Sequence, residues 1–225
     1  MIRKLLIWDI DGTLVDCGSA GRLAMDKTFK ELYGVDNGFE GICMAGRLDQ
    51  VILKDALKTH GIDQADLEVF YAHYKHVLDD VLDKTDVKVY KGVIDVLEYT
   101  KNRHDLLNVI STGNSEVGAW LKLKHAGIDH HFEHGGFGCG FSKREDLVGH
   151  IIRDVENKHQ ISLKSNHVFV IGDTPHDITS GKHHDATTIA VLTGHYTREE
   201  LQAYEPTYII DNFSKIDDFI DMLEV

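Results

Sequence analysis

The sequence Leu5-Leu6-Ile7-Trp8-Asp9-Ile10-Asp11-Gly12 begins with four apolar residues and ends with two acids and a glycine. Its apolar part does not alternate with polar residues, which is typical of a strand that is buried on both faces. The glycine permits a sharp turn directly after the acids. The stretch therefore predicts a central strand of a parallel sheet, followed by an acidic turn.

Four later segments resemble this strand, each being a short apolar run that ends in polar residues. They span residues 106–110, 168–171, 188–192 and 208–210. Helical patterns fill the gaps between them. One begins near Gly92, and the others cover residues 116–126, 144–158, 198–204 and 213–223, with Ser115 and Ser214 as candidate caps. This order predicts an α/β fold with a doubly wound parallel sheet, in which ligands bind at the carboxyl ends of the strands.

Residues 17–89 interrupt this order. They contain helical patterns at about 20–33, 48–59 and 64–83 and no convincing strand. We predict an inserted α-helical cap subdomain over 17–89, with residues 1–16 and 90–225 forming the α/β core. The alternative, two ordinary crossover helices of the core, is disfavoured because no strand separates the patterns.

The composition excludes several classes of protein. A net charge of −13 over 225 residues repels a phosphate backbone, so we expect neither a nucleic-acid nor a membrane partner. The three cysteines Cys17, Cys43 and Cys139 form no CxxC pair, which favours a reducing compartment. The apolar run at the N-terminus is too short for a signal peptide, so the predicted location is the cytoplasm. The sequence leaves the oligomeric state open.

Asp9 and Asp11 are the first candidates for catalysis. They lie two residues apart at a strand end, so both carboxylates can face the same space. One acid of such a pair can attack phosphorus while the other transfers a proton, provided that their environments differ. An ordinary turn is the alternative interpretation, since Asp-Gly is a common turn dipeptide.

A second group of acids follows another predicted strand. Gly172-Asp173-Thr174-Pro175-His176-Asp177 comes directly after the apolar residues 168–171, which places its acids at the same edge of the sheet. Carboxylates from two strand ends form a hard oxygen site suited to Mg²⁺. A bound cation would also offset the cost of burying several acids.

Two further segments can contribute to phosphate binding. Thr112-Gly113-Asn114 ends a predicted strand, where a hydroxyl and backbone amides can receive phosphate oxygens. By itself this segment is equally explained as a turn with a helix cap. Lys143-Arg144 lies at the start of a predicted helix, between two candidate active-site strands. A basic pair in such a place is of interest because an acidic protein needs local positive charge to bind an anion.

These motifs together resemble those of the haloacid dehalogenase superfamily of phosphatases. Residues 9–16 read DIDGTLVD and resemble its DxDGTLxD signature, and residues 172–177 match its GDxxxD motif. Thr112 matches the Ser/Thr of the second motif, with the adjacent Ser111 as the less favoured choice, and Lys143-Arg144 would supply the basic residue of the third. The resemblance spans nearly the whole chain and includes a helical cap after the first motif.

The resemblance implies a mechanism for the paired acids. Asp9 would attack phosphorus and form an aspartyl-phosphate, while Asp11 would protonate the leaving alcohol and then activate water. It also implies a Mg²⁺ cofactor held by Asp9, the backbone carbonyl of Asp11, and Asp173, with Asp177 orienting the outer shell of the metal.

The resemblance also assigns the phosphate contacts. Thr112 and the basic residue at 143 or 144 would bind the oxygens of the transferring phosphoryl group. Thr13, Gly113 and Asn114 would line the substrate site. Many relatives have Lys-Pro in the third motif where this chain has Lys143-Arg144, so the residue that reaches the site is open. We prefer Arg144, from its register with residues 146–148.

The cap offers one candidate for substrate selection. In relatives a cap loop over the site chooses the substrate, and Arg47 near the start of a predicted cap helix could bind a substrate carboxylate. A solvent-exposed arginine at a helix start is the equally weighted alternative.

The resemblance predicts a Mg²⁺-dependent phosphatase of small phosphorylated metabolites, with phosphoglycolate-like phosphomonoesters as the first choice of substrate. A sugar phosphomutase of the same superfamily would keep every core residue and remains an alternative. A non-hydrolytic phosphoacceptor signalling module is a second alternative, disfavoured because it would not need a cap over its aspartate. A 2-haloacid dehalogenase is disfavoured because it needs neither Asp11 nor Mg²⁺.

Overall fold

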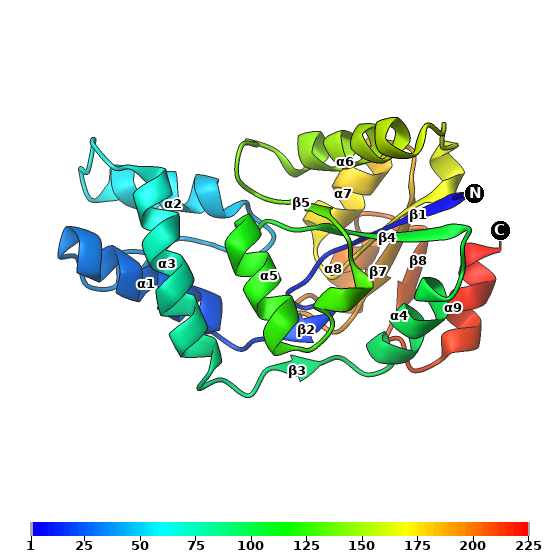
Figure 1. The fold of residues 1–225 in the computed structure, drawn as a ribbon, viewed down its shortest axis with the longest axis horizontal. Coiled ribbons are helices and arrows are strands. Elements are labelled where there is room, and N and C mark those ends of the chain that lie inside the picture. Colours follow the sequence, from blue (N-terminus) through cyan, green and yellow to red (C-terminus); the bar gives the residue numbers. More distant parts are fainter. Residues whose placement is uncertain (1, 225) are drawn as a thin grey trace.

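A six-stranded parallel sheet forms the centre of the molecule in the computed structural model, which describes residues 2–224 (Figure 1). The strand order is β5-β4-β1-β6-β7-β8, and each neighbouring pair is parallel. The strands are β1 (Lys4–Trp8), β4 (Leu106–Ser111), β5 (Gly135–Gly136), β6 (Val168–Gly172), β7 (Thr187–Val191) and β8 (Tyr208–Ile210). The predicted doubly wound α/β fold is confirmed.

Helices cover both faces of this sheet. One face packs against α4 (Val93–Lys101), α5 (Glu116–His125) and α9 (Ile216–Leu223). The other packs against α6 (Arg144–His159), α7 (Pro175–His183) and α8 (Arg198–Gln202). Short 3₁₀ helices cover Asp129–His131 and Ser165–His167.

Strand β1 is central because it is apolar on both sides. Leu6 and Trp8 pack into the core on the α4–α5–α9 face, and Leu5 and Ile7 pack into the core on the α6 face. The Trp8 indole N–H donates to the Asn108 side chain at 3.0 Å, which satisfies its polar atom inside the core. The acids that follow Trp8 therefore start from a strand whose last four residues are buried.

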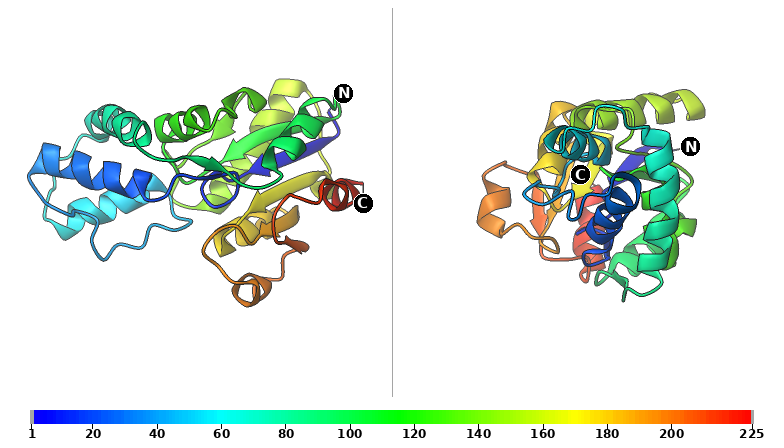
Figure 2. Two further views of the ribbon diagram at one scale, coloured as in Figure 1. Left: turned by 90° about the horizontal axis from the view of Figure 1, so that it is seen from below. Right: turned by 90° about the vertical axis from the view of Figure 1, so that its left-hand side faces the viewer.

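Three helices lie between two short antiparallel strands, β2 (Val15–Asp16) and β3 (Lys88–Val89). They are α1 (Ala20–Tyr33), α2 (Asp49–Thr59) and α3 (Leu67–Leu82). Figures 1 and 2 show them gathered beyond the carboxyl ends of the sheet strands, with α9 at the opposite end. We name residues 17–89 the cap segment. Its status as a separate subdomain with these bounds stays a prediction.

Local signals account for some helix starts and fail at others. Ser115 caps α5 as predicted, accepting from the Gly118 amide. Ser214 does not cap α9, whose N-cap is Lys215. Helix α7 was not predicted, although Pro175 at its first turn and a Thr174/Asp177 capping box are both start signals.

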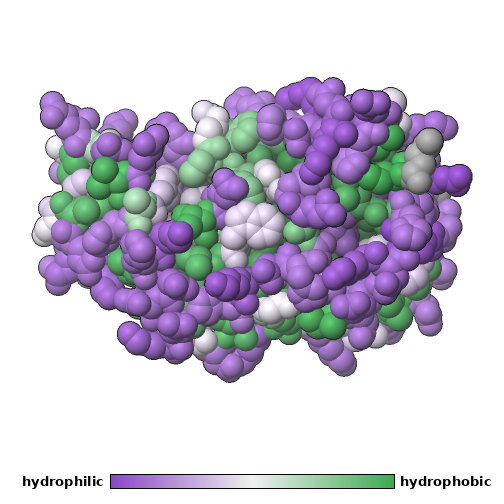
Figure 3. Space-filling model, in the orientation of Figure 1, coloured by the Kyte–Doolittle hydropathy of each residue, from purple (hydrophilic) through white to green (hydrophobic). Residues whose placement is uncertain are grey.

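The polarity of the surface is what the high content of charged residues leads one to expect. The face in Figure 3 is mostly hydrophilic, with scattered apolar patches. Among residues 2–224, no helix combines the length and the apolar character needed to cross a membrane.

Candidate active site

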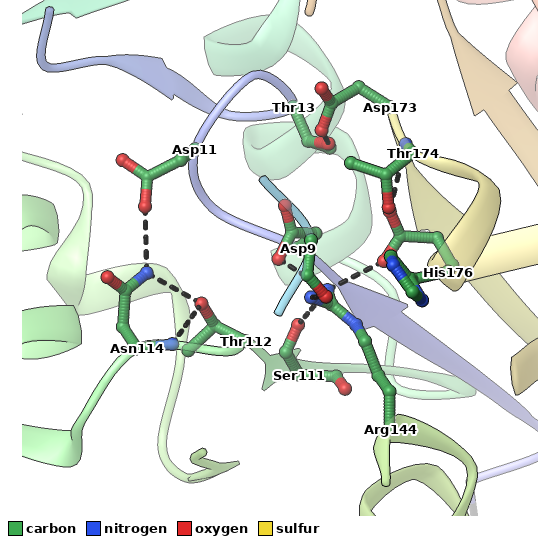
Figure 4. A network of polar contacts seen from close by, with 12 residues as sticks. Asp9, Asp11, Thr13, Ser111, Thr112, Asn114, Arg144, Asp173, Thr174 and His176 are labelled. Atoms are coloured by element: carbon green, nitrogen blue, oxygen red, sulfur yellow. Dashed lines mark hydrogen bonds and ion pairs between the residues drawn. The ribbon is translucent and has the colours of Figure 1, made fainter. Parts of the chain in front are cut away.

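The polar turns after β1, β4 and β6 meet at one edge of the sheet, next to the cap segment (Figure 4). Asp9 follows β1, while Asp173 and Asp177 follow β6. Carboxylate oxygens of these three acids lie within 4.8 Å of one another, and all three residues are buried. We name the three, together with Arg144, the acidic cluster.

Arg144 is the only basic residue in the acidic cluster. Its Nη2 donates to Asp9 Oδ1 and to Asp177 Oδ1, both at 2.6 Å. It also donates to the Ser111 carbonyl at 3.3 Å. The first residue of α6 thus points its guanidinium to the ends of β1 and β4, whereas the preceding Lys143 is exposed.

Asp177 uses both carboxylate oxygens to hold other groups in place. While Oδ1 accepts from Arg144, Oδ2 accepts from the Thr174 amide at 3.0 Å and the Thr174 hydroxyl at 2.7 Å. These bonds close the capping box at the start of α7. Asp177 therefore positions the arginine and the acidic turn rather than facing open space.

Asp173 is fixed by close backbone packing. The Thr13 hydroxyl donates to its Oδ1 at 3.2 Å. A Cβ at Gly12 would lie 2.3 Å from Asp173 Oδ2, and one at Gly194 would lie 1.7 Å from the same oxygen. Gly12 also has a φ of +84°, in the left-handed region that favours glycine. The glycines make room for the carboxylate between two turns.

The three acids of the acidic cluster, when ionised, carry more negative charge than one arginine can balance. Burial raises the pKa of Asp9 to about 7, against the opposing effect of Arg144. Burial and the neighbouring Asp9 carboxylate raise the pKa of Asp173 to about 8. Buried carboxylates in this number are costly unless a cation compensates them.

The cluster fits a hard divalent cation by its chemistry. It offers carboxylate oxygens from two strand ends, which are the ligands that Mg²⁺ prefers. Asp9 and Asp173 are the residues that would hold the ion. Asp177 already spends its oxygens on Arg144 and Thr174, which suits the predicted outer role. The predicted backbone ligand, the Asp11 carbonyl, stays a prediction.

A second group of polar side chains surrounds Asp11, on the other side of Asp9 from Asp173 (Figure 4). Asp11 Oδ2 accepts from Asn114 Nδ2 at 2.8 Å and from Lys122 Nζ at 2.5 Å. Lys122 also donates to Asn114 Oδ1 at 2.8 Å. We name Asp11, Asn114 and Lys122 the Asp11 cluster. The Asn114 amide group also donates to the Thr112 hydroxyl at 2.7 Å, linking the cluster to the end of β4.

Comparison with known proteins agrees with this arrangement. A family model described as haloacid dehalogenase-like hydrolase matches residues 6–191, which include every residue of both clusters. The chain belongs to this family. The predicted membership and the predicted class of enzyme, a hydrolase of the phosphatase type, are confirmed.

Individual members of the haloacid dehalogenase-like family match over nearly the full chain. The chain is 26% identical over 224 residues to the pyrophosphatase PpaX of Oceanobacillus iheyensis, covering 96% of both proteins. It is 25% identical over 223 residues to a phosphoglycolate phosphatase of Mesorhizobium japonicum, covering 96% of this chain and 94% of the relative. A solved hydrolase of the family from Streptococcus pneumoniae shares the fold, with a TM-score of 0.68 at 22% identity, covering 97% of this chain and 98% of that one.

The structure brings most of the predicted site residues of this family member together. Asp9, Asp173 and Asp177 lie together, whereas the Asp11 side chain contacts Asn114, which in turn contacts Thr112. Thr13 contacts Asp173, and Arg144 rather than Lys143 reaches Asp9. The catalytic and binding roles of these residues stay predictions.

The predicted specificity residue Arg47 lies in the loop before α2. Its guanidinium donates to Asp55 at 2.5 Å and to the Cys43 carbonyl at 3.0 Å, both within the cap segment. Its own carbonyl packs against Gly113, where a Cβ would come within 2.1 Å. The neighbouring Gly46 carbonyl accepts from Arg144 at 3.4 Å, so this loop covers the acidic cluster.

Lys122 and Asp49 were missed by the sequence analysis. Asp49, the first residue of α2, is buried and accepts from the Ser115 amide at 2.8 Å, joining the cap segment to α5. Lys122 is one of the buried residues of α5, together with Gly118, Ala119 and Leu123. A lysine among the mostly apolar residues 117–123 was the available signal.

Proposed function

We propose that this protein is a Mg²⁺-dependent hydrolase of small phosphomonoesters that works through an aspartyl-phosphate on Asp9. The observation that carries the proposal is the contrast between two acids only two residues apart. Asp9 is buried against an arginine and two other acids, whereas the side chain of Asp11 is 43% exposed and lies beside a lysine. Two carboxylates in such different surroundings can perform different tasks.

The first half-reaction transfers the phosphoryl group to the protein. A carboxylate oxygen of Asp9 attacks phosphorus, the bond from phosphorus to the ester oxygen breaks, and Asp11 donates a proton to that oxygen. An alcohol leaves, and Asp9 carries the phosphoryl group as an acyl phosphate.

The second half-reaction releases phosphate. Asp11, now a carboxylate, takes a proton from a water molecule as the water oxygen attacks phosphorus. The bond between phosphorus and the Asp9 oxygen breaks, which returns Asp9 as a carboxylate and Asp11 as an acid. Inorganic phosphate leaves the site.

The phosphoryl oxygens need positive charge and hydrogen-bond donors as they cross the site. The Arg144 guanidinium, whose Nη2 lies 2.6 Å from Asp9 Oδ1, would bind them together with the Thr112 hydroxyl at the adjacent strand end. A Mg²⁺ ion on Asp9 and Asp173 would supply further positive charge to the same oxygens. The net negative protein thus gains the local positive field that an anionic substrate requires.

Phosphoglycolate is the first substrate to test, because a relative that matches 96% of this chain is named a phosphoglycolate phosphatase. Another relative is named a pyrophosphatase, so a panel is needed rather than one compound. In this proposal the cap segment selects the substrate. Arg47 releases Asp55 and binds the carboxylate of the substrate instead.

A phosphate-release assay over a panel of metabolites, with Mg²⁺ or with chelator, tests the proposal. We expect inorganic phosphate from phosphoglycolate or another small phosphomonoester, and none after chelation. Conversion of one sugar phosphate into its isomer without phosphate release would replace the proposal by a phosphomutase. Absence of both products across the panel, from folded and Mg²⁺-loaded protein, would refute hydrolysis and isomerisation alike.

A further inference from the structure

Lys122 is a buried lysine in contact with the proposed acid/base. Its side chain is 5% exposed, and its Nζ lies 2.5 Å from Asp11 Oδ2. A buried lysine is rare unless its charge is paired, and Lys122 pairs with the Asp11 carboxylate.

The Asp11 cluster is a closed triangle. Lys122 and Asn114 both donate to Asp11 Oδ2, and Lys122 also donates to the Asn114 carbonyl oxygen. Two donors that share one acceptor oxygen and are also hydrogen-bonded to each other restrict the rotation of the Asp11 side chain more than either would alone. Within residues 2–224 both hydrogen bonds to this side chain end on Oδ2, so Oδ1 is the oxygen left to meet a substrate.

The cap segment helps to enclose the ammonium. Gly21 of α1 lies against it, since a Cβ at Gly21 would be 3.4 Å from Lys122 Nζ and 3.8 Å from the Tyr74 hydroxyl. Tyr74 of α3 is itself buried. Helices α1 and α3 of the cap segment therefore help to enclose the Lys122 ammonium, and Asp11 is the carboxylate with which it forms an ion pair.

We propose that Lys122 is a positioning residue that, with Asn114, fixes Asp11 Oδ2 and thereby orients Asp11 Oδ1 towards the oxygen of the leaving group. This inference rests on the proposed function, because it assigns Lys122 to the proton transfer of that reaction. Lys122 acts through Asp11 and does not bind the substrate. Its removal should therefore affect the same step as the loss of Asp11, with smaller magnitude.

The test compares Lys122→Met with Lys124→Met, a matched change at an exposed position of the same helix. Both variants are assayed with two substrates. The alkoxide leaving group of phosphoglycolate needs a proton to leave, whereas the nitrophenolate of p-nitrophenyl phosphate leaves without one. For Lys122→Met we expect kcat with phosphoglycolate to fall about 10–10²-fold, part of the roughly 10²–10⁴-fold that acid–base help provides. KM should stay within about twofold, and Lys124→Met should match the parent.

A double-variant cycle gives the second readout. In an Asp11→Asn background, adding Lys122→Met should change the rate of Asp9 phosphorylation by less than about twofold, because the residue through which it acts is gone. A further loss of tenfold or more would show that Lys122 acts independently of Asp11 and would overturn the proposal. An increase in KM for phosphoglycolate with kcat unchanged would make Lys122 a substrate-binding residue and would also overturn it.

A failure of the Lys122 proposal can be distinguished from a folding defect and from a failure of the proposed function. If Lys122→Met does not fold, Lys122→Gln keeps an N–H donor at this position and should retain more phosphoglycolate turnover than Lys122→Ala. Equal turnover of these two folded variants would contradict positioning by a donor. If the parent protein releases no phosphate from any member of the metabolite panel, the proposed function itself fails, an outcome that no Lys122 variant can produce.

Discussion

The acidic cluster and the Asp11 cluster lie on either side of the end of β1, and they differ in charge and in exposure. The acidic cluster holds three buried acids with one arginine. The Asp11 cluster pairs one acid with one buried lysine, and the acid is 43% exposed. Excess buried negative charge calls for a cation, whereas a balanced and partly open pair can exchange protons with solvent.

The difference arises from partners far away in the sequence. Asp9 meets Arg144 across 135 residues, and Asp11 meets Lys122 across 111 residues. Neighbouring positions of one turn thus acquire separate environments because the sheet brings α6 to one side and α5 to the other. The comparison predicts that changes in the two clusters will have different signatures.

The largest effect is expected in the acidic cluster, from Asp9→Asn. Loss of a nucleophile removes the covalent route, so turnover of every substrate should fall on the order of 10⁴–10⁶-fold. Initial rates of phosphate release measure this loss. The exposed Asp86→Asn is the matched control and should be neutral. Residual turnover of a tenth or more would remove Asp9 from the mechanism.

Arg144→Met is expected to have the next largest effect. It removes donors to the phosphoryl oxygens, so kcat/KM should fall about 10²–10³-fold. It also leaves two buried acids without their partner, which should lower the free energy of unfolding by about 3–5 kcal/mol. Urea titration and phosphate release measure the two effects. Lys143→Met should change neither, and the reverse result would assign the third motif to Lys143.

The excess charge of the acidic cluster predicts a pH-dependent response to Mg²⁺. Because the pKa values of Asp9 and Asp173 are raised to about 7 and about 8, the metal-free protein binds more protons than the unfolded chain. Its stability should therefore fall as pH rises from about 4 to 8. Mg²⁺ competes with these protons, so it should bind more tightly at pH 8 than at pH 5.5.

Thermal unfolding measures this response without an activity assay. At a Mg²⁺ concentration about 100 times Kd, the midpoint at pH 8 should rise by about 5–10 °C. The rise should be smaller at pH 5.5, and Asp173→Asn should reduce it at pH 8. An equal rise of the unfolding midpoint at both pH values would show that Mg²⁺ does not compete with protons on Asp9 and Asp173, and it would contradict the proposed metal site.

The smallest expected effect lies outside both clusters, at Arg47. Its ion pair with Asp55 is partly exposed, with side chains 28% and 49% exposed, and such pairs contribute about 0.2–1 kcal/mol. If Arg47 binds a substrate carboxylate in this way, Arg47→Ala should raise KM for phosphoglycolate by up to about fivefold. KM for p-nitrophenyl phosphate should not change. Equal changes of KM for both substrates would show that Arg47 supports the structure of the cap segment and does not bind a substrate carboxylate.

The sequence predicted those parts of the fold that have a strong local pattern. Strands such as β1 and β6 are buried on both faces and can be recognised from their apolar runs. Strands β2, β3 and β5 have two residues each, too few to form a pattern. They exist because tertiary pairing, rather than local preference, orders them.

The site was predictable where a motif stands next to a strand end. Asp9 and Asp173 could be placed at one edge because parallel strands share their direction. Lys122 could not, because only the packing of α5 against Asp11 reveals where its side chain ends. The choice between Lys143 and Arg144 likewise depends on how α6 is rotated against the sheet.

The division of tasks between Asp9 and Asp11 is tested most directly by trapping the phosphoenzyme in Asp11→Asn. This variant keeps the nucleophile and removes the group that activates water. With p-nitrophenyl phosphate we expect a burst of about one nitrophenolate per active site, followed by turnover reduced roughly 10²–10⁴-fold. Intact mass should show one added phosphoryl group, and peptide mapping after acid quenching should place it on Asp9. A phosphate mapped to His176, or steady turnover at the parent rate without a burst, would contradict the mechanism.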